Sequence, residues 1–143
     1  MQKINLFQYA VHKVQCGGIV KLLIVESSKA VHHRLIELLG GVEILTALSV
    51  ARNLAELTER LEQLRPDTVV LDIDFPDGKS LHHIGAIREK LPNVCIYVFS
   101  NHSDCRERAL NMGADEFYDK SLEFEQLIET LLAHMLRGQK IVQ

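Results

Sequence analysis

The chain has 143 residues, of which 47% are hydrophobic and 24% are charged. These values are those of an ordinary globular protein and argue against disorder, and the length fits one domain. The formal net charge is −3 and the basic residues are scattered, so direct binding to nucleic acid is not expected. No apolar segment approaches the roughly 20 residues of a membrane span, and the N-terminal segment lacks the apolar core of a signal peptide. We therefore expect a cytoplasmic protein without a membrane partner.

The cysteines, Cys16, Cys95 and Cys105, show no C-x-x-C spacing. An odd number of cysteines without this spacing predicts neither a disulfide framework nor a zinc site. A reducing compartment suits such a set.

From residue 20 onward, short apolar segments typical of strands alternate with amphipathic segments typical of helices. The expected strands, in chain order, cover residues 20–25, 42–48, 68–71, 94–99 and 117–118. The first of them is almost wholly apolar, as expected of a central strand that is covered on both faces.

Helices are expected where apolar residues recur every three or four positions. Ser28 can cap the first helix, which ends at the Gly40-Gly41 pair. The second helix ends near Pro66 and the third ends before Pro92, because proline disfavours a continuing helix. A short fourth helix ends at Gly113, and a fifth closes the domain. The apolar stripes are Val31, Leu35, Leu38 and Leu39; Leu54, Leu57, Leu61 and Leu64; Leu81, Ile84, Ile87 and Leu91; Ala109, Leu110 and Met112; and Phe124, Leu127, Ile128, Leu131 and Met135.

Strands that are joined by helical crossovers predict an α/β fold with a doubly wound, five-stranded parallel sheet and helices on both faces. We assign residues 20–138 to this domain and residues 139–143 to a C-terminal tail. Residues 1–19 form an N-terminal extension. Its apolar residues at helical spacing are Ile4, Phe7, Val11 and Val14. This spacing favours an amphipathic helix, which could cap the domain or pair two chains. The alternative is a frayed tail.

Polar residues follow the predicted strands at the edge where doubly wound sheets bind their ligands. Glu26 follows the first strand, Asp72 the third and Lys120 the last, and Ser100 follows the fourth. A carboxylate pair can hold Mg²⁺, a lysine can pair with a phosphoryl oxygen, and a hydroxyl can form a hydrogen bond to it. The set predicts a site at which Asp72 accepts a phosphoryl group.

At these residues the chain resembles the receiver domains of two-component response regulators, including those of chemotaxis. The matching segments are Lys21-Leu-Leu-Ile-Val-Glu26, Val69-Val-Leu-Asp72-Ile-Asp-Phe-Pro76-Asp-Gly78, Val98-Phe-Ser100 and Gly113-Ala-Asp-Glu-Phe117-Tyr-Asp-Lys120. The resemblance implies the flavodoxin-like receiver fold with strand order 2-1-3-4-5. It also implies that Asp72 is the phosphoacceptor, Lys120 pairs with the phosphate, and Ser100 and Phe117 form the switch.

Two positions depart from the family pattern. Receivers usually have two adjacent acids after the first strand, but Ser27 stands at the second position, so one carboxylate for Mg²⁺ is missing and metal affinity should be weakened. Ser121 replaces the proline that usually follows the lysine, which should place Lys120 less rigidly. Asp74 lies two residues beyond Asp72, and the pleat period of two could turn its side chain to the same edge as a replacement ligand. The expected metal ligands are therefore Glu26, Asp72 and Asp74.

The resemblance implies a signalling protein and not a metabolic enzyme. The leading hypothesis is a stand-alone receiver that takes its phosphoryl group from a histidine kinase or phosphotransfer protein. It would then bind a downstream protein in trans, and it could also form a homodimer. The alternative is a pseudo-receiver that never accepts phosphate and acts as a scaffold or dimerisation module, as Ser27 and Ser121 would favour.

Two further hypotheses are weaker. Asp72-Ile73-Asp74 resembles the D-x-D motif of haloacid-dehalogenase-type phosphatases, but in those enzymes the motif ends the first strand, whereas here two strand–helix units precede it. A flavin site is disfavoured because the loop after the first strand is acidic and has no glycine to approach a phosphate.

Overall fold

The computed structural model describes residues 21–41, 47–75, 78–79 and 81–137. The N-terminal extension over residues 1–19 and the tail over residues 139–143 lie outside the described residues, as does most of the second predicted strand. No helix within the described ranges is long and apolar enough to cross a membrane.

A single parallel sheet forms the centre of the fold, with strand order β2-β1-β3-β6-β7. This order confirms the predicted 2-1-3-4-5 topology. The strands are β1 (Lys21–Val25), β2 (Ala47–Ala51), β3 (Thr68–Leu71), β6 (Cys95–Ser100) and β7 (Glu116–Asp119).

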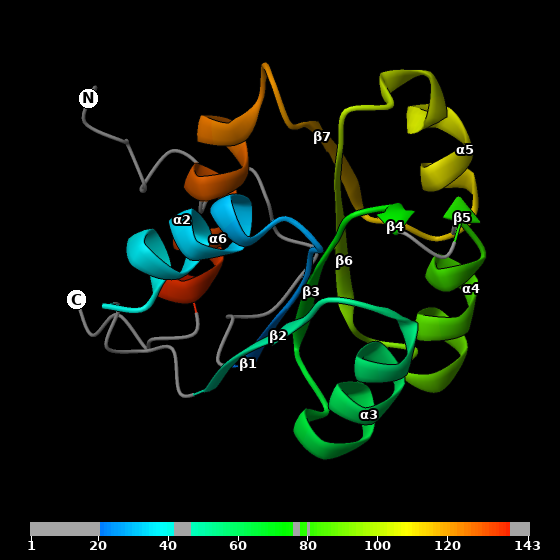
Figure 1. The fold of residues 1–143 in the computed structure, drawn as a ribbon, viewed down its shortest axis with the longest axis horizontal. Helices are drawn as coiled ribbons and strands as arrows, with labels where there is room; N and C mark the ends of the chain where they lie inside the picture. The colour runs from blue at the N-terminus through cyan, green and yellow to red at the C-terminus, as the bar shows by residue number, and fades with distance from the viewer. Residues whose placement is uncertain (1–20, 42–46, 76–77, 80, 138–143) are drawn as a thin grey trace.

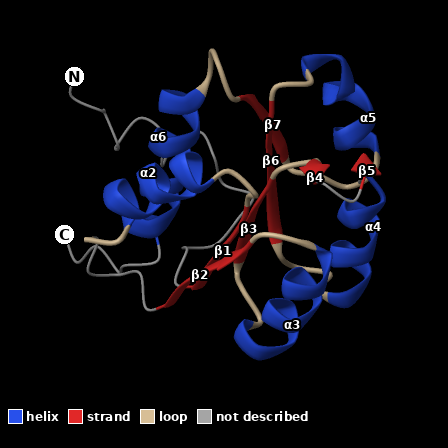
Figure 2. Cartoon of the chain, in the orientation of Figure 1, coloured by secondary structure: helices blue, strands red, loops and turns tan. Residues whose placement is uncertain are grey.

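Helices cover both faces of this sheet, as Figures 1 and 2 show. On one face lie α2 (Lys29–Leu39) and α6 (Phe124–Arg137), and on the other lie α3 (Leu54–Leu64), α4 (Leu81–Lys90) and α5 (Arg106–Asn111). A short 3₁₀ turn over Ser103–Cys105 precedes α5. The doubly wound architecture is therefore confirmed.

The two faces of β1 explain this layering. Leu22 and Ile24 pack in the cluster beneath α2 and α6, whereas Leu23 and Val25 pack in the cluster beneath α3 and α4. All four side chains are fully buried, and burying such a side chain contributes roughly 1.5–3 kcal/mol relative to leaving it exposed. The almost wholly apolar segment predicted the two-sided cover correctly.

The helix ends follow local signals. The Ser28 side chain accepts a hydrogen bond from the Val31 amide at 3.4 Å at the start of α2, as predicted. Asn53 caps α3 in the same way by accepting from the Glu56 amide at 2.9 Å. Arg65 ends α3 with a left-handed backbone, φ 47°. The two N-caps lie in the loops that follow β1 and β2 at the carboxyl edge of the sheet, whereas Arg65 leads into β3 at the opposite edge.

Two details depart from the sequence analysis. The segment after Asp72, for which no strand was predicted, contains a small antiparallel pair, β4 (Asp74–Phe75) and β5 (Gly78–Lys79). Strands of two residues are too short to show an alternating pattern. Cys95 is disulfide-bonded while Cys105 is free and buried; the prediction of no disulfide was wrong for Cys95, because spacing alone does not reveal pairing.

Candidate functional site

Three charged residues lie directly beyond the carboxyl ends of the sheet strands. Backbone hydrogen bonds hold each of them in register with a neighbouring strand. The Glu26 amide donates to Ala51 O at 2.9 Å, the Asp72 amide to Val25 O at 2.9 Å, and the Lys120 amide to Ser100 O at 3.0 Å. The sheet therefore brings together segments that are far apart in the sequence.

The Lys120 ammonium joins the two acids. Its Nζ lies 2.6 Å from Glu26 Oε1 and 2.8 Å from Asp72 Oδ2. The Lys120 side chain is 13% exposed, against 2% for Glu26 and 4% for Asp72. The expected convergence of these three residues is thus present in the structure, and Lys120 is the partly open member of the group.

Burial and charge shift the titration of this group. Burial raises the pKa of Glu26, the negative charge of Asp72 adds to the rise, and Lys120 opposes it. Burial lowers the pKa of Lys120, but hydrogen bonds and charge from Asp72 and Glu26 outweigh it, so the pKa of Lys120 is raised overall. The ammonium therefore stays protonated at neutral pH. With both acids ionised, the three side chains carry a net charge of minus one.

Further hydrogen bonds orient both carboxylates. The Ser28 amide donates to Glu26 Oε2 at 3.2 Å, where the N-terminus of α2 favours a negative charge. The Asp74 amide donates to Asp72 Oδ1 at 2.9 Å. One oxygen of each acid is thus held by a backbone N–H and the other by Lys120.

The two residues expected to form the switch are both buried. Ser100 is the last residue of β6 and is 0% exposed, and its Oγ accepts from the His102 amide at 3.0 Å. Phe117 in β7 is 3% exposed. The Arg106 guanidinium lies 4.9 Å from the centroid of the Phe117 ring, and its Nη1 donates to Phe117 O at 2.9 Å. The Phe117 ring is therefore packed inside the fold, with Arg106 against it.

The Asp74 carboxylate is engaged elsewhere. His102 Nε2 lies 2.8 Å from Asp74 Oδ2, and both side chains are partly exposed. The structure thus places the Asp74 backbone beside Asp72 but pairs its carboxylate with His102.

The family model of the response regulator receiver domain matches residues 22–132. The chain belongs to this family. The receiver is 30% identical over 112 residues to the nitrate/nitrite response regulator protein NarL of Escherichia coli K12, covering 77% of this chain and 52% of that protein. It is 31% identical over 110 residues to the DNA-binding transcriptional activator DevR/DosR of Mycobacterium tuberculosis, covering 76% and 51%. The receiver therefore spans about half the length of these relatives.

Solved structures support the fold independently. The signal receiver domain of a DNA-binding response regulator from Colwellia psychrerythraea superposes with a TM-score of 0.73 at 22% identity, covering 83% of this chain and 98% of that one. At this level of identity the likeness shows the shared fold alone.

The donor set of the receiver suits a magnesium ion with few protein ligands. Mg²⁺ is usually held by one or two carboxylates and keeps several waters, and Glu26 and Asp72 supply two neighbouring carboxylates. Ser27, which is half-buried, offers a hydroxyl where receivers usually have an acid. The described residues contain no cluster of three or more histidines, cysteines or acids that could hold a metal. The residues thus fit a weakly held ion and do not form a closed metal cage.

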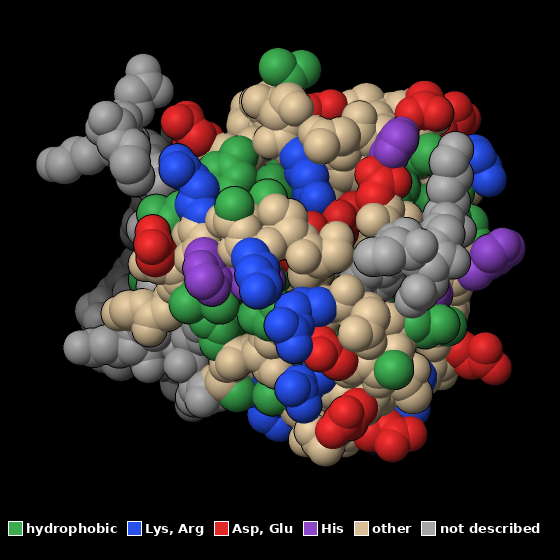
Figure 3. Space-filling view, in the orientation of Figure 1, with side chains coloured by type: hydrophobic (Ala, Val, Ile, Leu, Met, Phe, Trp, Pro, Cys, Tyr) green, Lys and Arg blue, Asp and Glu red, His purple; other side chains and the backbone are tan. Residues whose placement is uncertain are grey.

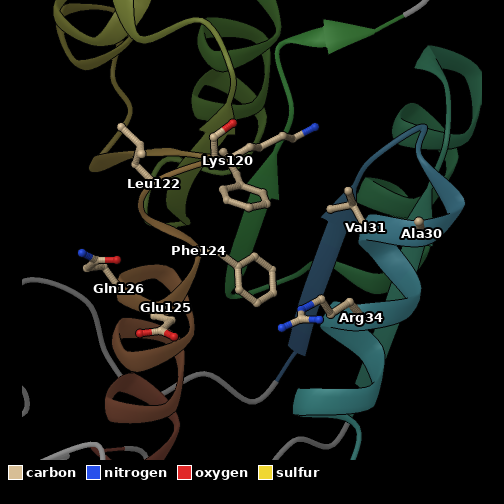
Figure 4. Close-up of a pocket in the computed structure, with 10 residues that line it drawn as sticks. Ala30, Val31, Arg34, Lys120, Leu122, Phe124, Glu125 and Gln126 are labelled. Atoms are coloured by element: carbon tan, nitrogen blue, oxygen red, sulfur yellow. The ribbon is translucent and has the colours of Figure 1, made fainter. Parts of the chain in front are cut away.

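A cavity of about 590 Å³ lies next to the acceptor site and shares Lys120 with it. Figure 4 shows Val31 and Arg34 of α2 on one side and Phe124 of α6 on the other. The Arg34 guanidinium lies 5.1 Å from the centroid of the Phe124 ring. On the face drawn in Figure 3, basic and acidic side chains are interspersed over the molecule.

Sequence reasoning missed the residues that support the site. Arg106 contacts Phe117 and pairs with Glu123, and Asp119 accepts hydrogen bonds from Ser103, Ser121 and Leu122. A hydrophobic pattern gives no signal for such contacts, because they join polar side chains of different elements.

Proposed function

We propose that this receiver accepts a phosphoryl group on Asp72 and passes the signal to another protein. The observation that carries the proposal is the Lys120 ammonium between two nearly buried carboxylates, 2.8 Å from Asp72 Oδ2 and 2.6 Å from Glu26 Oε1. A buried acid beside a fixed cation suits the transfer of a negatively charged group.

The chemistry would be a displacement at phosphorus. An Asp72 carboxylate oxygen attacks the phosphoryl group of a phosphohistidine in a histidine kinase or phosphotransfer protein. The phosphorus–nitrogen bond breaks, an acyl phosphate forms, and the electron pair stays on the imidazole. The Lys120 ammonium would pair with the phosphoryl oxygens as negative charge develops on them. Mg²⁺ held by Glu26 and Asp72 would supply further positive charge when bound.

The output surface would be the face made by α5, β7 and α6. Phe117 of β7 is buried with Arg106 of α5 over its ring, and Leu110 of α5 is 41% exposed. A phosphoryl group on Asp72 would draw Ser100 toward it by a hydrogen bond, and the buried Phe117 would follow, which would shift the population of conformations of this face. We therefore expect the partner in trans, or a second copy of the chain in a homodimer, to bind more tightly after phosphorylation.

Intact-mass analysis after incubation with acetyl phosphate and Mg²⁺ tests the acceptor. A phosphoryl adduct should form on the wild type and on Asp74→Asn, which keeps Asp72, but not on Asp72→Asn. If no adduct forms on the wild type even at high Mg²⁺, the chain is a pseudo-receiver, and a constitutive scaffold or dimerisation module becomes the better account.

A further inference from the structure

We propose that Asp119 is a positioning residue whose carboxylate replaces the usual proline ring in fixing the backbone that carries Lys120. The inference rests on the proposed role of Lys120 at Asp72. It concerns a residue of β7 that the sequence analysis gave no role.

The Asp119 carboxylate accepts hydrogen bonds from three donors that lie in two loops. Its Oδ1 accepts from the Ser121 amide at 2.8 Å and from the Leu122 amide at 3.0 Å. Its Oδ2 accepts from the Ser103 hydroxyl in the turn before α5. Asp119 is only 9% exposed as a residue. These contacts tie the segment between β7 and α6 to the loop after β6.

The backbone of Asp119 is fixed as well. Its amide donates to Glu123 Oε1 at 3.0 Å, and its carbonyl accepts from the Glu123 amide at 2.8 Å. Glu123 is held in turn by Arg106, which also bonds to the Phe117 carbonyl. The loop that carries the lysine is therefore connected to the aromatic residue of the switch.

The backbone amide of residue 121 is needed for this arrangement, because a proline at this position has no N–H to donate. Where receivers usually have a proline, this chain has Ser121, whose amide donates a hydrogen bond to the Asp119 carboxylate. The Ser121 hydroxyl also donates to Asn101 Oδ1 at 3.0 Å. Lys120 is therefore held between a strand residue on one side and a hydrogen-bonded turn on the other. Ser121 was expected to leave Lys120 less rigidly placed. We infer instead that the hydrogen bond from the Ser121 amide to Asp119 fixes the backbone beside Lys120.

Electrostatics favour the same role. The hydrogen bond from Ser103, with those from the Ser121 and Leu122 amides, holds the pKa of Asp119 below its ordinary value. The carboxylate stays ionised at neutral pH and accepts all three hydrogen bonds, and charge-assisted hydrogen bonds are the stronger kind.

The test compares Asp119→Ala, Asp119→Asn and the double variant Asp119→Ala/Ser121→Pro in the full chain. Two readouts are used: the NMR signal of the hydrogen-bonded Lys120 ammonium without phosphate, and the rate of acyl phosphate formation with acetyl phosphate. Asp119→Ala should lose the ammonium signal and slow phosphorylation by about tenfold or more, because small misplacements of reacting groups are costly. The double variant should recover most of both, since the proline ring fixes the backbone in another way. Asp119→Asn keeps Oδ1 as an acceptor and should retain most of the signal.

Ser121→Ala is the matched control. It removes the hydroxyl but keeps the amide that bonds to Asp119, so both readouts should stay near wild type. The proposal is overturned if Asp119→Ala keeps the ammonium signal, or if the proline fails to restore it while the double variant is folded. If Asp119→Ala is unfolded, the double variant decides: a folded Asp119→Ala/Ser121→Pro protein that shows the ammonium signal supports the proposal, because the proline ring has then replaced the carboxylate, and a folded double variant without the signal overturns it. A wild type that shows the signal but forms no acyl phosphate refutes the proposed function and not the anchoring role.

Discussion

Replacing Lys120 with methionine isolates the electrostatics of the acceptor site. The change keeps a long unbranched side chain and removes only the charged group. In the structure that group lies 2.6 Å from Glu26 Oε1 and 2.8 Å from Asp72 Oδ2, and the two carboxylates are 2% and 4% exposed. The variant therefore has two neighbouring buried negative charges without the cation that offsets them.

The expected loss of stability is large for a single substitution. Removing one partner of a buried ion pair costs roughly 3–5 kcal/mol. Lys120 keeps 13% of its side chain exposed, so the free energy of unfolding at pH 7 should fall by an amount near the lower end of that range, about 3 kcal/mol. No such loss should accompany removal of an exposed ion pair, because solvent screens it.

The loss should depend on pH with a definite sign. Lys120 lowers the pKa of Glu26, so its removal raises that pKa further. Between the unfolded pKa of Glu26 and this raised value, the folded variant binds more protons than the unfolded chain. Its free energy of unfolding therefore falls as pH rises through this window. The difference from wild type should be greatest at neutral pH and should shrink in acid, where the Glu26 carboxyl is protonated.

Urea denaturation of wild type and Lys120→Met at neutral and acidic pH measures both effects. Lys90→Met is the matched control, because the Lys90 ammonium pairs with Glu62 at 2.9 Å on the surface, where the two side chains are 37% and 65% exposed. The control should change little. The reasoning is refuted if the two variants lose similar stability at pH 7, or if the loss in Lys120→Met is the same at both pH values.

Three further substitutions test separate parts of the site. Burial raises the pKa of Glu26 above its ordinary 4.5, so the free energy of unfolding of the wild type should decline as pH rises above that value. Glu26→Gln should flatten this decline in urea titrations. An unchanged slope would show that Glu26 is not its source. Asp74→Asn should leave Mg²⁺ affinity within about twofold by calorimetry, because the Asp74 carboxylate pairs with His102; a tenfold or larger drop would instead make Asp74 a ligand. Ser27→Asp should tighten Mg²⁺ binding by about tenfold by adding a third carboxylate, and unchanged affinity would show that residue 27 does not face the ion.

The sequence alone was enough to predict the fold and the centre of the site. Alternating apolar and amphipathic segments predicted the parallel sheet and its two helical layers, because strand and helix periodicity report which side of each element is buried. Glu26, Asp72 and Lys120 were found because each follows a strand. The carboxyl ends of parallel strands share one edge, so position in the chain was sufficient to predict their meeting.

Only the tertiary structure decided how those residues are held and what they contact. Asp74 was predicted as a metal ligand and Asp119 was given no role, yet Asp74 pairs with His102 and Asp119 accepts hydrogen bonds from the loop that follows Lys120. Phe117 was predicted from the family pattern as a switch residue, but the contact of Arg106 with its ring was not predicted. Hydrophobic periodicity predicts the buried face of each helix and strand. It does not predict which partners the polar side chains contact. Their partners depend on distances between loops, which arise only when the elements have packed together.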